Sequence, residues 1–260
     1  MLDFVFPADP LDPKRPDEHF AGQLTELSSA GFGTRLVRDP VVEYGGEIAG
    51  FYPNATVVYR GWMLDARQYR NLYAAIRLGG GVPLTSPTAY LLAHHLPNWY
   101  PLLRDLTPET VIFDEDADLT TELQALGWGR FFLKDYVKSL KTTRGSFISD
   151  PSQAALLLEE MRRYRGMIEG GICVRRVETF IEHSERRYFV LHGRAHAPAG
   201  QAIPHIVQIV AERVDHPFFS VDVATTDRGE MRVVEIGDGQ VSDLVGWSIA
   251  EFAQIWPKVS

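Results

Sequence analysis

Two acidic residues lie in neighbouring apolar runs near the C-terminal end of the chain, where they could bind a metal ion together. Residues 218–224 and 231–236 are apolar and β-branched, and a turn-forming stretch separates them. Asp222 lies in the first run and Glu235 in the second, so pairing of the two strands can bring both carboxylates to one sheet face. Close buried carboxylates repel unless they share a proton or a cation, and Mg²⁺ prefers oxygen ligands such as those of the following residues 237–240. A magnesium site and a plain hairpin with one solvent-facing acid are both open at this point.

Lys134 is a second candidate, because it interrupts an otherwise apolar run at residues 130–136. A lysine in such a strand must either extend to solvent or meet an anion. The basic loop that follows offers Lys138, small hydroxyl residues and backbone N–H groups, which can hold phosphate oxygens. The GxxxxGK[ST] spacing of a Walker loop is absent. A solvated basic loop is the alternative interpretation.

A third candidate stretch covers residues 177–190. Glu178, Thr179 and Phe180 are strand-like and could present backbone N–H and C=O groups to a planar base. Glu185 and Arg187 are two residues apart, so on a strand their side chains face the same way. They could form a surface ion pair of little energetic value, or bind ribose hydroxyls and a phosphate, since guanidinium matches phosphate oxygens bidentately.

Composition limits the class of protein. The chain has 260 residues, of which 45% are hydrophobic and 23% charged, as expected for a compact soluble protein. A formal net charge of −8 argues against a general nucleic-acid binder. The single cysteine, Cys173, fits a reducing compartment, and its apolar surroundings indicate a packed thiol. With no signal peptide and no membrane-spanning stretch in the sequence, we expect a cytoplasmic protein that does not bind membranes. The histidines form no metal-binding set.

The order of predicted elements favours an α/β fold. Strands alternate with helices in the first hundred residues, which predicts a small lobe with a largely parallel sheet. Asp65, Ser86, Asp150 and Ser248 are predicted helix caps, and Gly127 is predicted to end a helix at residues 119–126. Residues 203–214 fit either a strand or a helix. The predicted domains are an N-terminal domain, a central lobe and a C-terminal lobe, with bounds 1–100, 101–177 and 178–260.

These candidates occur in an order that resembles the ATP-grasp superfamily, over roughly residues 100–245. The segments YRGWML at 59–64, TPET at 107–110 and EIGDGQVSDL at 235–244 are similar to its arginine-two-lysine clade. The resemblance implies an ATP-grasp fold of α+β lobes, in which an N-terminal pre-ATP-grasp lobe precedes two lobes that hold the nucleotide between them.

The resemblance also implies roles for individual residues. Lys134 would contact the adenine side and the α-phosphate, and Lys138 would lie over the phosphates. The backbone of residues 178–180 would form the adenine-binding hinge. Glu185 would bind the ribose, and Arg187 would steady the γ-phosphate and an acyl phosphate.

Asp222 and Glu235 would match the magnesium ligands of the superfamily. Many members have asparagine two residues after the glutamate, whereas this chain has Gly237 there. Asp238 or Gln240 would then supply the third ligand. Arg60, Arg194 and Asp243 are weaker candidates for an acceptor pocket.

The implied activity is that of an ADP-forming carboxylate–amine ligase that uses ATP and Mg²⁺. A carboxylate would take the γ-phosphoryl group to give an acyl phosphate, and an amine (such as that of an amino acid or peptide) would displace phosphate to form an amide. A homodimer is a further expectation. The alternatives are an ATP-dependent phosphotransferase and a nucleotide-binding regulatory module without turnover.

Overall fold

The structure is a computed structural model that describes residues 1–137 and 145–257. The chain forms two compact units, each assembled from segments that are distant in the sequence. The first unit comprises Met1–Ala93, Arg186–Val221 and Gly237–Ser260. The second comprises His94–Glu185 and Asp222–Ile236. The three domains expected from the sequence stay a prediction.

The first unit contains a parallel sheet with strand order β2-β1-β3-β4. The central strand β1 (Leu2–Pro7) is buried at every residue, as expected where both faces of a parallel sheet are covered. The remaining strands are β2 (Gly33–Val37), β3 (Thr56–Tyr59) and β4 (Val82–Pro83). The helices of this region are α1 (Glu18–Ser29), α2 (Asp39–Tyr44), α3 (Ala66–Leu78) and α4 (Pro87–His94). The predicted N-terminal α/β region with a parallel sheet is confirmed.

Helix boundaries follow the capping residues in the sequence. The Asp65 carboxylate accepts hydrogen bonds from the backbone N–H groups of Arg67 and Gln68 and so starts α3. Ser248 starts α9 (Ile249–Gln254) in a capping box with Glu251. Gly127 ends α6 (Leu119–Leu126) with a φ of 65°, a left-handed conformation that glycine adopts without strain.

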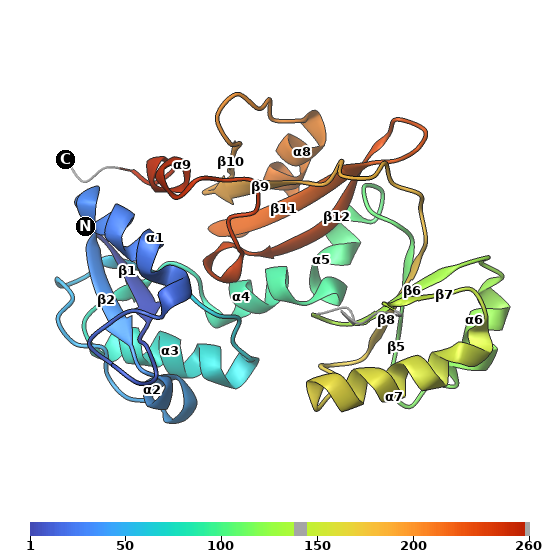
Figure 1. The fold of residues 1–260 in the computed structure, drawn as a ribbon, viewed down its shortest axis with the longest axis horizontal. Helices are drawn as coiled ribbons and strands as arrows, with labels where there is room; N and C mark the ends of the chain where they lie inside the picture. Colours follow the sequence, from blue (N-terminus) through green and yellow to red (C-terminus); the bar gives the residue numbers. More distant parts are fainter. Residues whose placement is uncertain (138–144, 258–260) are drawn as a thin grey trace. The chain divides into compact units, whose positions relative to one another are not determined.

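The second unit contains an antiparallel sheet with strand order β5-β8-β6-β7. Its strands are β5 (Thr110–Phe113), β6 (Phe131–Asp135), β7 (Phe147–Ile148) and β8 (Ile172–Arg176). Side chains of α6 and of α7 (Ala154–Arg165) pack with Leu133 and Val174 in one apolar cluster. Figure 1 shows α7, in yellow, along this sheet. Because side chains alternate along a strand, Lys134 faces away from that cluster. The remaining helical elements are α5 (Leu96–Leu103) and the 3₁₀ turn η1 (Pro151–Gln153).

A third sheet has the strand order β10-β9-β11-β12. The boundary between the units passes through its two long strands, β11 (Phe218–Thr225) and β12 (Met231–Asp238). The N–H of Thr226 donates to the carbonyl of Glu230 at 2.8 Å, which closes the predicted hairpin. The other elements are β9 (Arg186–Leu191), β10 (Arg194–His196), α8 (His205–Arg213) and the 3₁₀ turn η2 (Gly239–Val241).

In two segments the structure differs from the sequence prediction, and in a third it shows which of two predictions is right. Residues 186–195 form two strands, because His192 and Gly193 turn the chain with φ values of 48° and 72°. Residues 203–214 contain helix α8, whose buried residues recur at helical spacing. Residues 178–181 form no regular strand and make a single bridge, from Phe180 to Thr226. Within the described ranges, no helix is both long and apolar enough to cross a bilayer.

Candidate functional site

Lys134 and Glu235 form a direct ion pair in the second unit. The Lys134 Nζ lies 2.6 Å from Glu235 Oε1, and the two side chains are 6% and 44% exposed. Strand β6 directs the lysine away from the α6–α7 side of its sheet, and β12 supplies the glutamate. The strand lysine therefore meets an anion, and that anion is one of the predicted metal ligands.

Arg175 is a second buried cation on the same sheet face, and sequence reasoning missed it. Lys134 is paired with Cys173 across β6 and β8, so Arg175, two residues further along β8, points the same way. Its Nη1 donates to the Val234 carbonyl at 2.7 Å and its Nη2 to Thr107 Oγ1 at 2.5 Å. Its Nε is buried without a hydrogen-bond partner among the described residues. The signal in the sequence was a charged residue two positions after Cys173 in the apolar run ICVRR.

Lys134, Arg175 and Glu235 influence the pKa values of the groups around them. Burial lowers the pKa of the Arg175 guanidinium, and the neighbouring Glu235 carboxylate opposes that change most strongly. Burial raises the pKa of the Cys173 thiol to about 12, although Lys134 and Arg175 act against the rise. Cys173 is thus a protonated, packed thiol, as predicted, and Glu235 lies in the field of two cations.

The other two predicted metal ligands lie in different surroundings. Asp222 is 5% exposed in the middle of β11. Asp238 belongs to the first unit and is fully buried, where its Oδ1 accepts hydrogen bonds from the N–H and the side-chain amide of Gln240. Its Oδ2 is 3.1 Å from His216 Nε2, although the angles do not make a hydrogen bond. The part of the chain that the structure describes holds no group of three histidine, cysteine or acidic residues able to bind a metal.

The predicted hinge has a free backbone edge. Ile181 N–H donates to Thr225 and Asp227 N–H to Thr179, which bridges the segment to the hairpin turn. In such an antiparallel bridge, the N–H and C=O groups of Glu178 and Phe180 point the opposite way. Within residues 1–137 and 145–257 these groups have no hydrogen-bond partner. The segment thus offers the donor and acceptor groups that the sequence analysis expected, without being a strand.

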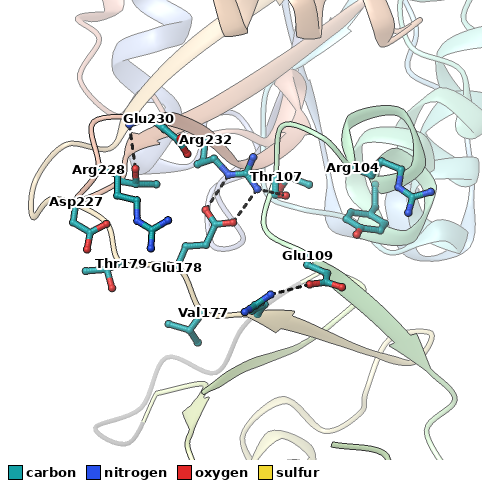
Figure 2. A pocket seen from close by; sticks show the side chains of 13 residues that line it. Arg104, Thr107, Glu109, Val177, Glu178, Thr179, Asp227, Arg228, Glu230 and Arg232 are labelled. Carbon is teal, nitrogen blue, oxygen red and sulfur yellow. Dashed lines mark hydrogen bonds and ion pairs between the residues drawn. The ribbon is translucent and has the colours of Figure 1, made fainter. Parts of the chain in front are cut away.

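The Glu178 carboxylate is held by Arg232 through two hydrogen bonds, of 2.9 and 2.8 Å. The same guanidinium donates to the carbonyls of Asp105 and Thr107. Figure 2 shows this pair in the wall of a polar pocket of about 700 Å³. The pocket is lined by thirteen residues of the second unit, which include Glu178 and Thr179 and exclude Lys134, Arg175 and Glu235.

The predicted ribose and phosphate residues lie at the start of β9. Glu185 is exposed and ends a segment of the second unit, whereas Arg187 is half-buried and belongs to the first. Arg187 Nη1 donates to the Asp243 carbonyl at 3.0 Å, and its own carbonyl accepts from Trp247 Nε1 at 3.0 Å. Lys138, the predicted loop lysine, lies outside the described residues.

Arg60 is a core residue, not a residue of a substrate pocket. It is 1% exposed, and its guanidinium donates to the Gln23 side chain and to the carbonyls of Gly239 and Ser242. It also lies 4.7 Å from the centre of the Phe252 ring. Burial lowers its pKa to about 10, while Asp243 and Asp238 oppose this change. Arg60 ties β3 to the segment after β12.

Comparison with known proteins identifies the fold. The chain is similar to solved structures of ATP-grasp proteins, which defines the fold as ATP-grasp. D-cycloserine synthetase DcsG aligns with a TM-score of 0.66 at 14% identity, over 97% of each chain. A RimK domain ATP-grasp protein of Sphaerobacter thermophilus aligns with a TM-score of 0.63 at 15% identity, over 98% of each chain. ATP-grasp ligase PsnB, complexed with a minimal precursor, aligns with a TM-score of 0.61 at 12% identity, over 97% of each chain.

The family follows from the sequence itself. The family model for the ATP-grasp domain of the arginine-two-lysine clade, family 3, matches residues 125–258, which is just over half of the chain. The protein therefore belongs to the arginine-two-lysine clade of the ATP-grasp family, as the order of its candidate residues had indicated. No curated protein matches the chain.

Proposed function

We propose that this protein is an ATP-dependent carboxylate–amine ligase that forms an amide or peptide bond and releases ADP and phosphate. Its substrates would be a carboxylate and an amine, such as amino acids or short peptides. ATP-grasp neighbours whose names describe ligases and synthetases, among them one complexed with Mg and ADP, are consistent with this reaction class.

The observation that carries the proposal is the contact between Lys134 and Glu235. A nearly buried ammonium and a half-exposed carboxylate at 2.6 Å are the two charges that a Mg²⁺–triphosphate requires. The lysine is able to exchange its carboxylate for a phosphate, and the glutamate its ammonium for a metal. Arg175 adds a buried cation beside them, and its Nε has no partner among the described residues.

Adenine would bind at the free edge of the hinge. Adenine offers a ring nitrogen that accepts and an amino group that donates, and the backbone of Glu178 and Phe180 provides both complementary groups. The two hydrogen bonds from Arg232 to the Glu178 carboxylate would preorganise the hinge for adenine. Glu185 would bind the ribose hydroxyls, and Lys138 and Arg187 would bind phosphate oxygens.

Asp222 and Glu235 would hold Mg²⁺, with Asp238 as a third candidate ligand. Two carboxylates together with phosphate oxygens and water make an ordinary magnesium site, so the donor set fits without a third acid. When bound, the metal neutralises charge on the transferring phosphoryl group. The Asp238 oxygens already contact Gln240 and His216, so we expect this residue to contribute least.

The chain's own residues would then carry out two steps. Lys134 and Arg187 would hold the triphosphate so that a substrate carboxylate oxygen attacks the γ-phosphorus, which breaks the bond to the ADP oxygen. The resulting acyl phosphate would be attacked by the amine at its carbonyl carbon, with loss of phosphate. No covalent bond to the protein is needed, because positioning and charge compensation supply the catalysis.

The test is a screen for ADP release with pooled amino acids and short peptides. We expect amine-dependent ADP release from the native protein and a loss of about 10²-fold or more in Glu235→Gln. Glu212→Gln, an exposed acid on α8, is the matched control and should behave like the native protein. Equal ADP release from Glu235→Gln and the native protein would remove Glu235 from its role.

Other outcomes separate the alternatives. A stable phosphorylated product without amine dependence indicates a phosphotransferase, and nucleotide binding without ADP release from any substrate indicates a regulatory module. A homodimer remains our expectation for the oligomeric state, which light scattering on the purified protein measures.

A further inference from the structure

A cluster of polar and aromatic side chains surrounds the loop that holds Arg187 in the first unit. Arg187 donates to the backbone carbonyl of Asp243, and the carboxylate of the same residue lies 3.4 Å from His19 Nε2. The imidazole in turn lies against Trp62, with ring centres 4.8 Å apart and planes inclined by 33°. The three side chains come from three distant parts of the chain: α1, the segment after β3 and the segment after β12.

These groups are accessible. The side chains of His19 and Asp243 are 48% and 69% exposed, and Trp62 is 48% exposed although it is one of the largest apolar side chains. A solute can therefore reach the imidazole and the carboxylate from the solvent side.

The imidazole of His19 is contacted on several sides. Asp17 caps α1 by accepting the His19 N–H at 2.9 Å on Oδ1, and it accepts the Trp62 indole N–H at 2.9 Å on Oδ2. Asp17 thus binds both the backbone of His19 and the indole that lies against its side chain. The Phe20 ring meets His19 edge-on, with centres 4.8 Å apart. Two aromatic rings and one carboxylate therefore contact the imidazole.

The contact with Asp243 fits one tautomer of the imidazole. If Nε2–H donates to the carboxylate, the lone pair lies on Nδ1, where it can accept a proton. In the part of the chain that the structure describes, Nδ1 has no hydrogen-bond partner. The charged groups around it are Asp17 and Glu18 on its own segment, Asp243 opposite, and Arg187 through Asp243.

We propose that His19, oriented by Asp243 and Trp62, is the general base that deprotonates the amine substrate beside Arg187. This inference rests on the proposed ligase function, because an ammonium cannot attack an acyl phosphate until it loses a proton. One proton of the R–NH₃⁺ group passes to His19 Nδ1. The nitrogen lone pair then forms the C–N bond, the C–O bond to the phosphoryl group breaks, and a second proton leaves the nitrogen with the departing phosphate.

The cluster also defines the class of amine. The exposed indole face of Trp62 and the Asp243 carboxylate both attract a cation, so the substrate enters as an ammonium and is neutralised only at the imidazole. A primary aliphatic amine, such as the α-amino group of an amino acid or peptide, fits this chemistry. An anionic nucleophile does not.

The experiment compares two nucleophiles in the presence of ATP, Mg²⁺ and pooled amino acids. Hydroxylamine is uncharged at neutral pH and needs no base, whereas an amino group does. In His19→Gln we expect amine-dependent ligation at pH 7 to fall about 10²-fold, with hydroxamate formation and the KM for ATP unchanged. Amide formation should recover as the pH rises toward the range in which the amine is itself uncharged. Asp243→Asn should lose less, and added imidazole should restore part of the activity of His19→Ala.

His205→Gln, another exposed histidine at the start of a helix of the same unit, is the matched control. Native-like ligation at pH 7 in His19→Gln would overturn the base assignment while leaving the ligase intact. Equal losses with both nucleophiles would also overturn it, because they indicate a structural role. Absence of hydroxamate and ADP even in the native protein would overturn the proposed function, and the base with it.

Discussion

Two buried arginines, one in each unit, show how similar burial serves different purposes. Arg60 is 1% exposed and Arg175 is 7% exposed, and each donates to backbone carbonyls or side-chain oxygens of distant segments. The guanidinium of Arg60 donates through Nε, Nη1 and Nη2, and it also lies over the Phe252 ring. Arg175 leaves its Nε without a partner among the described residues, next to Lys134 and Glu235. The fully used donors of Arg60 fit a structural role, whereas a donor without a partner among the described residues, beside Lys134 and Glu235, is our reason to assign Arg175 to the candidate site.

The largest expected effect is the loss of stability on substitution of Arg60. Arg60→Met leaves the Gly239 and Ser242 carbonyls and the Gln23 amide oxygen buried without their donor. We expect the free energy of unfolding to fall by about 3–5 kcal/mol, measured by chemical denaturation. Arg67→Met, at an exposed arginine that pairs with Glu43, is the control and should change little. A native-like midpoint for Arg60→Met would contradict the structural role.

Arg175→Met should affect stability less and ligand binding more. Loss of its hydrogen bonds to Val234 and Thr107 is expected to cost about 1–2 kcal/mol. The affinity for Mg²⁺–ADP, measured by calorimetry on the folded variant, should fall about tenfold or more, because the proposed phosphate site would lose a cation. Arg175→Lys should not restore binding fully, since an ammonium cannot bridge the same two acceptors. Arg175→Met could instead bind Mg²⁺–ADP like the native protein and lose as much unfolding free energy as Arg60→Met. Both arginines would then have a purely structural role.

Cys173 lies beside Arg175, and the raised pKa of its thiol predicts how stability depends on alkaline pH. Its thiol has an ordinary pKa of 9.0 in the unfolded chain and about 12 in the fold, so between these pH values only the unfolded state loses the proton. The contribution of the thiol to stability is present below pH 9 and is lost as the pH rises toward 12. We expect iodoacetamide to label native Cys173 only as fast as the protein unfolds, and Cys173→Ala to reduce the alkaline loss of stability. Rapid labelling of the folded protein at pH 8 would show that the thiol is not packed.

The smallest expected change in stability concerns the N-terminal cap of α9, the helix whose Phe252 ring contacts Arg60. Hydrogen bonds from Ser248 and from the Ala199 N–H lower the pKa of the Glu251 carboxyl below its usual value of 4.5. A lowered pKa means that the stabilisation is complete above pH 4.5 and is lost as the pH falls through the folded-state value. Glu251→Gln should therefore melt slightly below the native protein at pH 7, and the difference should narrow in acid. A difference that widens in acid would contradict the assignment of the cap.

Local signals in the sequence predicted much of this structure. Asp65, Asp150, Ser248 and Gly127 set helix ends through contacts within a few residues, and the hairpin around the Asp227 turn is equally local. Lys134 was found because a charged residue interrupts an otherwise apolar run at residues 130–136. Such features depend on neighbours in the sequence, so the sequence suffices to find them.

The features that were missed depend on partners far away in the chain. Arg175 contacts Val234 and Thr107, and His19 contacts Asp243, over separations that no local pattern encodes. The hinge at residues 178–181 looked like a strand because Thr179, Phe180 and Ile181 are β-branched or aromatic, but in the fold it makes only an isolated bridge to Thr226. Strand β1 was hidden for another reason: burial on both faces leaves no alternation to detect.

The ion pair between Lys134 and Glu235 has a consequence for how the protein should be screened. Since the lysine already compensates the glutamate, the chain does not depend on a divalent ion to relieve repulsion at that position. Chelating agents should leave its melting temperature almost untouched and yet stop turnover. Thermal-shift screening against metals alone would then overlook the requirement, which becomes visible only when nucleotide and metal are supplied together.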